Sequence, residues 1–225
     1  MCGRFLLYTD PKTLEVKFHF YLAVDLENRY NIAPSQDVPI VRYDPTNDRR
    51  EMVKMRWGLV PFWAKDEKIG NRMINARAET VHEKPAFRAA FSKRRCIVPA
   101  SGFYEWKEAR GGKQPYLIRL ADGEPMAFAG IWERWTKGEE PLETFAIITT
   151  AANEQMSDLH DRMPVIFSKE QVDTWLDDSS DTEALREVLR PTEMELNYYQ
   201  VSRDVNSPRN DSEELIEKVN NGELW

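Results

Sequence analysis

Cysteine and histidine are both scarce in this chain of 225 residues, which holds two cysteines and three histidines. The two cysteines, Cys2 and Cys96, are too few for a disulfide framework. These five residues also lack the spacing of a structural zinc site. We therefore expect no metal ion and no cofactor.

Long apolar runs are missing as well. No stretch approaches the roughly 20 apolar residues that a membrane span requires, and the start of the chain has no basic-then-apolar signal pattern. With so few cysteines, this composition predicts a protein of a reducing compartment, the cytoplasm.

Several familiar catalytic motifs are absent. The sequence contains no GxxxxGK[ST] loop, no GxGxxG, no HExxH and no GxSxG. Nucleotide-binding loops, zinc proteases of that type and nucleophile-elbow hydrolases are therefore excluded. No repeat, low-complexity tract or flexible linker interrupts the chain, so we expect a single domain over residues 1–225.

The net charge of −7 conceals an asymmetry between the two halves. Residues 1–100 carry 18 Lys/Arg and 12 Asp/Glu, whereas residues 101–225 carry 13 and 26. A basic first half can attract phosphate while an acidic second half keeps the molecule in solution. The plainer alternative, that both are ordinary solvated surfaces, stays open on charge alone.

Short strand-like and helix-like segments alternate irregularly along the chain. Segments rich in β-branched and aromatic residues, bounded by Pro, Gly or Asp, predict strands; these are residues 37–43, 51–60, 94–98, 102–106, 115–120, 125–130, 143–150 and 164–167. Capping patterns and helical spacing predict short helices; these are residues 10–18, 168–177, 181–189 and 212–222, with another starting near Pro85. The pattern favours an α+β fold, with a mixed, mostly antiparallel, curled or barrel-like sheet and short peripheral helices.

Cys2 lies in the opening segment "MCGRF". Removal of Met1 would leave Cys2 with an α-amine and a thiol on adjacent carbons. Gly3 permits close approach of a ligand to the backbone, and Arg4 can hold an anion beside the thiol and lower its pKa. The alternative is that a cysteine at this position is incidental. Cys96, inside "RRCIVPA", is predicted to be a small buried apolar residue.

Two polar residues in "MINARAET" share one side of an extended segment. Asn75 and Arg77 are two positions apart, so their side chains project to the same face. An amide beside a guanidinium suits a charged, polar ligand. A turn in which Asn75 bonds to local backbone is the competing interpretation.

Glu105 and His160 are the candidates for proton transfer. Glu105 lies between Tyr104 and Trp106 in a strand-like stretch, where partial desolvation suits a general acid or base. The alternative is a solvent-facing carboxylate on an edge strand. His160 lies where a loop enters a strand, and it is the one plausible proton shuttle near neutral pH.

These segments together resemble the SOS response-associated peptidase (SRAP) family. The resemblance is carried by "MCGRF" (1–5), "RYNIAPSQDVPIV" (29–41), "RWGLVPFWAK" (56–65), "INARAET" (74–80), "RRCIVPASGFYEWK" (94–107), "ITTAANEQMSDLHDRMPVI" (148–166) and "VSRDVNSPRND" (201–211). Several of these strings are weak singly, but in this order they are specific and span nearly the whole chain.

The resemblance implies recognition of abasic sites in single-stranded DNA and covalent linkage through Cys2. It implies that Asn75, Glu105 and His160 surround the Cys2 nucleophile. Contacts to the DNA backbone would come from Arg4, Arg77, Thr149 and Arg162, and stacking or wedging residues would be Pro34, Phe62, Trp63 and Trp106. The bound protein would then be associated with the nucleoid, and we expect it to be a monomer.

The expected chemistry follows from the 1,2-aminothiol. Its amine condenses with the aldehyde of the opened sugar, and its thiolate closes a five-membered thiazolidine that shields the lesion. A self-processing peptidase that removes Met1 and an abasic-site lyase are further expected activities. Two alternatives remain: a peptidase of the N-terminal-nucleophile type with Cys2 as its nucleophile, and a non-covalent single-strand-binding module with an incidental Cys2.

Overall fold

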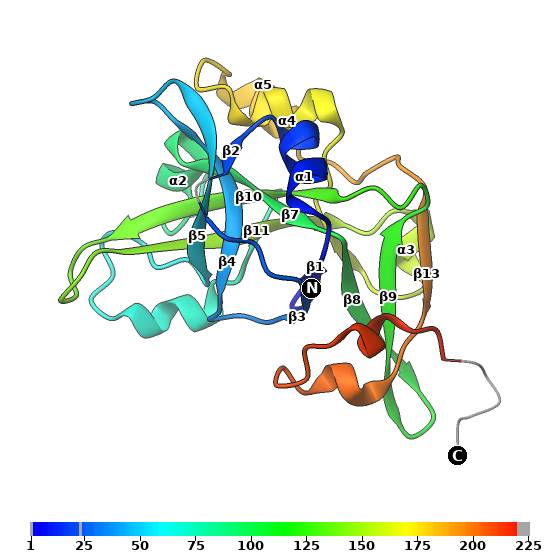
Figure 1. Ribbon diagram of the computed structural model, residues 1–225. Helices are drawn as coiled ribbons and strands as arrows, with labels where there is room; N and C mark the ends of the chain where they lie inside the picture. The colour runs from blue at the N-terminus through cyan, green and yellow to red at the C-terminus, as the bar shows by residue number, and fades with distance from the viewer. Residues whose placement is uncertain (1, 23, 220–225) are drawn as a thin grey trace.

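The computed structural model describes residues 2–22 and 24–219, and two curved sheets organise it (Figure 1). The strands of the first sheet run in the order β12-β11-β10-β7-β4-β5-β2, and β6 adds to β11. They are β2 (Tyr21–Leu22), β4 (Asp37–Asp44), β5 (Arg49–Trp57), β6 (Asn75–Arg77), β7 (Arg95–Ala100), β10 (Met126–Trp135), β11 (Leu142–Ala151) and β12 (Arg162–Pro164).

One additional pairing closes this sheet into a barrel. Strand β11 pairs antiparallel with β10, and it also pairs in parallel with β5, through Thr144 opposite Arg56 and Phe145 opposite Trp57. Strands β11, β10, β7, β4 and β5 therefore form a ring of five. Apart from the parallel pairings of β11 with β5 and β6 and of β2 with β5, this sheet is antiparallel. The predicted α+β fold with a curled, mostly antiparallel sheet is confirmed.

The second sheet is antiparallel and holds the N-terminal strand. Its order is β13-β9-β8-β1-β3. The strands are β1 (Phe5–Leu7), β3 (Arg29–Ile32), β8 (Gly102–Ala109), β9 (Gly112–Leu120) and β13 (Leu196–Gln200). Phe5 lies opposite Phe103, so the residues just before β1 run alongside the first half of β8.

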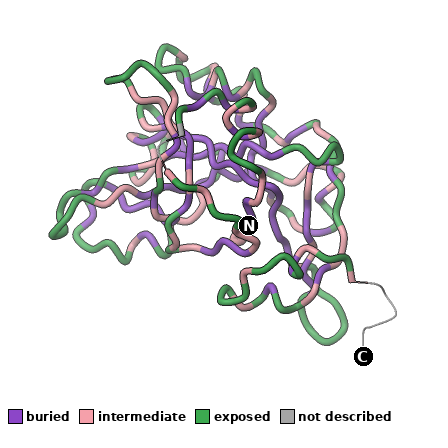
Figure 2. The backbone as a smooth tube through the Cα atoms, viewed as in Figure 1, coloured by how far each residue is buried: buried purple, intermediate pink, exposed green. Residues whose placement is uncertain are grey.

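The two sheets share one apolar core. The ring of Phe5, on the second sheet, meets Trp57 at 5.2 Å and Phe128 at 6.0 Å between centroids, both edge-on. Edge-to-face aromatic pairs of this kind add about 0.5–1.5 kcal/mol beyond the area they bury. Buried backbone concentrates where the sheets meet, whereas hairpin tips and outer loops are exposed (Figure 2). The start of β1 is therefore anchored in the centre of the molecule.

Short helices pack outside the sheets, and the predicted caps start three of them. Asp10, Ser168 and Asp181 each accept a hydrogen bond from the first turn of their helix, and Ser168 forms a capping box with Gln171. The helices are α1 (Pro11–Phe18), α2 (Arg88–Lys93), α3 (Glu154–Ser157), α4 (Lys169–Leu176) and α5 (Thr182–Glu187), with 3-10 turns η1 (Glu67–Arg72), η2 (Arg203–Asn206) and η3 (Glu213–Ile216). Within the described residues, none of these helices has the length and apolar character to span a bilayer.

Two predicted elements differ from the structure. The helix expected over 212–222 is wrong for the described residues up to 219, where only the turn η3 forms. The reason is that Val219 donates its N–H to the carbonyl of Gln200, so the chain leaves the turn extended beside β13. The helix expected near Pro85 begins at Arg88.

A close approach of two glycines shapes the loop after β5. Gly58 has a φ of 127°, and a Cβ there would lie 2.7 Å from the carbonyl oxygen of Gly70. Only residues without a side chain allow this contact. The intervening loop, which carries Phe62 and Trp63, is thereby folded back against the barrel.

Candidate functional site

Cys2 and Glu105 are brought together by the pairing of β1 with β8. The carbonyl of Arg4 accepts the N–H of Tyr104, which continues the register toward Cys2. Cys2 is fully buried, and Glu105 is 4 % exposed. The carboxylate acts electrostatically on the thiol, so the two groups are neighbours. Of the two interpretations of Glu105, the buried one is therefore confirmed.

Asn75 closes the site from the first sheet. Strand β6 runs parallel to β11 with Asn75 opposite Ile147. The Asn75 side-chain Nδ2 donates to the main-chain carbonyl of Cys2 at 2.8 Å. The Asn75 amide on the first sheet thus holds the backbone of Cys2, which lies just before strand β1 of the second sheet. The interpretation of Asn75 as a local turn residue is wrong.

The electrostatics at Cys2 favour the protonated thiol. Burial raises the pKa of the Cys2 thiol well above its ordinary value, and the Glu105 carboxylate raises it further. The main-chain N–H of Arg4 opposes this shift by donating toward the sulfur. The expectation of a lowered pKa is wrong, because the desolvated sulfur faces a carboxylate. A nucleophilic reaction at Cys2 therefore needs a base to take the thiol proton.

Arg4 has a structural role in addition to its nearness to Cys2. Its Nη1 donates to Asn31 Oδ1 at 2.8 Å and to the carbonyl of Val205 at 2.6 Å. The guanidinium also lies 5.8 Å from the centroid of the Trp106 ring. These contacts join the N-terminal segment to β3, β8 and the segment around η2.

His160 lies in the predicted position, in the loop that leads into β12. Its Nδ1 accepts the main-chain N–H of Arg162 at 2.9 Å, and Asp161 Oδ1 lies 2.8 Å from the same nitrogen. A neutral ring uses the Nδ1 lone pair for Arg162, whereas a protonated ring donates to Asp161. The Nδ1 atom of His160 thus has both a main-chain N–H and a carboxylate oxygen within hydrogen-bond distance.

Arg162 is the cation nearest to His160 along the chain. Its two terminal nitrogens hold both oxygens of Glu79, with Nη1 at 2.6 Å from Oε1 and Nη2 at 3.0 Å from Oε2. Nη2 also donates to the carbonyl of Thr149 at 2.6 Å. Thr149 itself is fully buried beneath these groups. Arg77, opposite Thr149 in the sheet, is exposed.

The aromatic residues predicted to stack on DNA differ in accessibility. Phe62 is 52 % and Trp63 43 % exposed, next to each other on the loop after β5. Pro34 is half-buried in a turn. The Trp106 indole N–H donates to Asn206 Oδ1 at 2.7 Å, which fixes that ring. Adjacent exposed aromatic rings are the feature here that most resembles a stacking platform.

Two residues that position the charged groups of the site were not predicted from the sequence. Asn31 is fully buried and bonds to Arg4, and Glu79 pairs with Arg162. Both lie in segments quoted above, but a polar residue in a strand or loop carries no sequence signal of its partner. Their importance follows only from contacts between distant elements.

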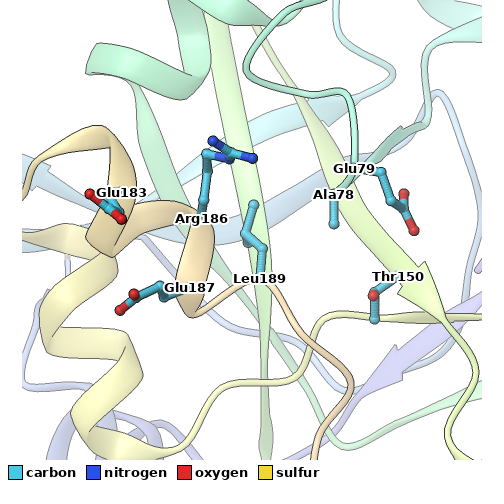
Figure 3. A pocket seen from close by; sticks show the side chains of 7 residues that line it. All are labelled: Ala78, Glu79, Thr150, Glu183, Arg186, Glu187 and Leu189. Atoms are coloured by element: carbon cyan, nitrogen blue, oxygen red, sulfur yellow. The ribbon is translucent and has the colours of Figure 1, made fainter.

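A surface hollow lies beside the Glu79–Arg162 pair. It has a volume of about 390 Å³, and in Figure 3 Glu79 and Thr150 lie on the opposite side of it from α5. It is lined by Ala78, Glu79, Thr150, Glu183, Arg186, Glu187 and Leu189. With three carboxylates to one guanidinium, the hollow itself does not suit DNA. No group of three or more His, Cys, Asp or Glu within residues 2–22 and 24–219 is arranged to hold a metal ion.

The sequence and the fold are similar to those of known proteins. A family model described as "SOS response associated peptidase (SRAP)" matches residues 1–208. The chain is 46 % identical over 224 residues to the abasic site processing protein YoqW of Bacillus subtilis, covering 96 % of this chain and 99 % of that one. It is 34 % identical over 225 residues to the abasic site processing protein HMCES of Gallus gallus, covering 86 % and 67 %. A crystal structure of a Bacteroides thetaiotaomicron protein superposes with a TM-score of 0.87 at 28 % identity, covering 97 % of this chain and all of that one. The chain therefore belongs to the SRAP family.

Proposed function

We propose that this protein captures abasic sites in single-stranded DNA as a covalent thiazolidine formed by Cys2 after removal of Met1. One observation carries the proposal most directly: the Cys2 thiol is buried against Glu105 while its carbonyl is held by Asn75 at 2.8 Å. The names of the relatives, abasic site processing proteins, agree with this substrate.

The reaction has two bond-forming steps. The α-amine of Cys2 adds to the aldehyde carbon of the ring-opened sugar, and the aldehyde oxygen leaves as water to give an imine. The sulfur then adds to the imine carbon, and the thiol proton ends on the nitrogen. The ring product therefore weighs one water less than the two reactants, and its closure removes the imine that would otherwise favour strand scission.

Three side chains have distinct parts in this scheme. Glu105 takes the proton from the Cys2 thiol and returns it to nitrogen. This step is needed because the raised pKa keeps the thiol protonated until it reacts. Asn75 fixes the Cys2 carbonyl and so the direction of the amine. His160 supplies and accepts the proton needed to open the sugar ring.

Binding of the strand draws on charge and stacking. Arg77 is an exposed cation, and Arg162 lies beside it across Thr149. Phe62 and Trp63 offer exposed faces for bases next to the lesion. Contacts to phosphate make the affinity fall with salt.

Intact-mass spectrometry tests the proposal. A recognition sequence for a site-specific protease is placed directly before Cys2, and cleavage leaves Cys2 as the first residue. The protein is then mixed with a single-stranded oligonucleotide bearing one abasic site. We expect a mass gain equal to the oligonucleotide minus one water in the native sequence and in Cys96→Ser. Cys2→Ala should give only an imine that requires borohydride to survive. A stable adduct in Cys2→Ala, or none in the native sequence, would refute the proposal.

A further inference from the structure

The donor inventory of Arg162 leaves little room for a phosphate. A guanidinium has five N–H groups. Nη2 uses both of its protons, on Glu79 and on the carbonyl of Thr149, and Nη1 uses one on Glu79. Nε is enclosed by protein without a hydrogen-bond partner among the described residues. A single Nη1 proton is thus left over.

The two ends of the ion pair differ in freedom. The Arg162 side chain is 13 % exposed and anchored to Thr149, whereas the Glu79 side chain is 50 % exposed. Glu79 also borders the hollow in which Arg186 lies (Figure 3). The carboxylate can therefore leave the guanidinium for solvent, but the guanidinium stays in place.

We propose that Glu79 is a selectivity residue, whose carboxylate occupies the bidentate edge of Arg162 until a DNA phosphate displaces it. This inference rests on the proposed function. An isolated anion gains little by replacing a carboxylate that already makes two charge-assisted hydrogen bonds. A strand that is also held by Arg77 and by stacking on Phe62 and Trp63 can make the exchange. Glu79 thus favours strands engaged at several points over other anions.

Fluorescence anisotropy separates this exchange from the covalent step. The probe is a labelled single-stranded oligonucleotide carrying a tetrahydrofuran analogue, which has no aldehyde to react. Glu79→Gln should lower the apparent Kd about fivefold, the upper range for a partly exposed ion pair. The slope of log K against log salt should also become more negative by about 0.7. In the native protein the phosphate contact at Arg162 replaces the Glu79–Arg162 ion pair, whereas in Glu79→Gln there is no such pair to lose.

Matched variants identify the cause. Glu187→Gln removes the same charge from the same hollow but leaves Arg162 paired, so the salt slope should not change. In Glu79→Gln combined with Arg162→Gln the gain should disappear. Glu79→Asp keeps the charge with a shorter reach, and should bind between the native protein and Glu79→Gln.

Opposite results have separate meanings. If the native protein forms the adduct and binds the probe but Glu79→Gln and Glu79→Asp bind no better, Glu79 only orients Arg162 and the inference is overturned. Equal gains in Glu187→Gln would overturn it too, because they would reflect net charge. Failure of the native protein to bind the probe or form the adduct would overturn the proposed function and, with it, this inference.

Discussion

Asn31→Ala should destabilise the protein strongly. The amide is fully buried, and its Oδ1 accepts from Arg4 at 2.8 Å. Its Nδ2 faces the carbonyl oxygens of Val205, Ser207 and Asn210 at 3.2, 3.0 and 2.7 Å. Two N–H groups and one acceptor amount to three hydrogen bonds, one of them to a charged group. Their loss should lower the free energy of unfolding by about 3 to 5 kcal/mol.

Thermal and urea unfolding measure this loss. For a chain of this size, such a change lowers Tm by about 6 to 20 °C. Asn31→Asp keeps the acceptor for Arg4 but turns both donors into acceptors that face carbonyls, and should also be destabilised. Asn197→Ala, on an exposed position of β13, should stay within about 0.5 kcal/mol of the native protein. An Asn31→Ala protein that melts within 3 °C of the native one, on the order of measurement scatter, would refute the reasoning.

Two further predictions concern titrating groups. In alkaline solution, where hydroxide rather than Glu105 takes the thiol proton, Glu105→Gln should speed alkylation of Cys2 by iodoacetamide, because burial and then the carboxylate raise the pKa of that thiol. Cys96, whose pKa burial alone raises, is the internal control, and its rate should not change. Equal rates at Cys2 before and after substitution would contradict the assigned contact. The hydrogen bond from Arg162 holds the pKa of Glu79 below its ordinary 4.5, so the pair stabilises the fold above that pH and is lost as pH falls through the lower folded value. The Tm difference between native protein and Arg162→Gln should therefore shrink between pH 7 and pH 3, and a constant difference would count against it.

Local patterns predicted most of the elements but not the contact that closes the barrel. Alternating apolar residues and flanking turn residues identify strands, and caps identify helix starts, because both depend on nearby sequence. The parallel pairing of Phe145 with Trp57 joins strands far apart in the chain. No local sequence feature distinguishes a strand edge that pairs with a distant strand from a strand edge that stays unpaired.

The failed helix at 212–222 shows tertiary structure overriding local propensity. The segment has a serine start and a suitable apolar spacing. Leu215 is buried and the Ile216 carbonyl accepts the Tyr199 hydroxyl, so the chain follows the edge of the second sheet. Contacts to a partner strand decided the conformation.

The candidate site was predictable by residue type and not by electrostatics. Cys2, Asn75 and Glu105 were chosen for their chemistry and their motifs, and the structure brings these three together. The pKa of the Cys2 thiol is raised first by burial and then by Glu105. The Arg4 guanidinium is held instead by Asn31 and by the carbonyl of Val205, and neither partner can be identified from the sequence.

The ties between Asn31 and the segment after β13 have a consequence for synthesis. Asn31 and Val205 are separated by 174 residues, so a ribosome adding about 5 to 20 residues per second makes Val205 about 9 to 35 seconds after Asn31. Until then the strand that follows Cys2 lacks the contacts that lock it in place. The proposed function requires Met1 to be removed, and a separate aminopeptidase would reach Met1 in this interval, whereas self-processing would need the completed fold; N-terminal analysis of chains stalled before residue 205 distinguishes the two. Nascent chains that keep Met1 until release would show that processing instead acts on the completed fold.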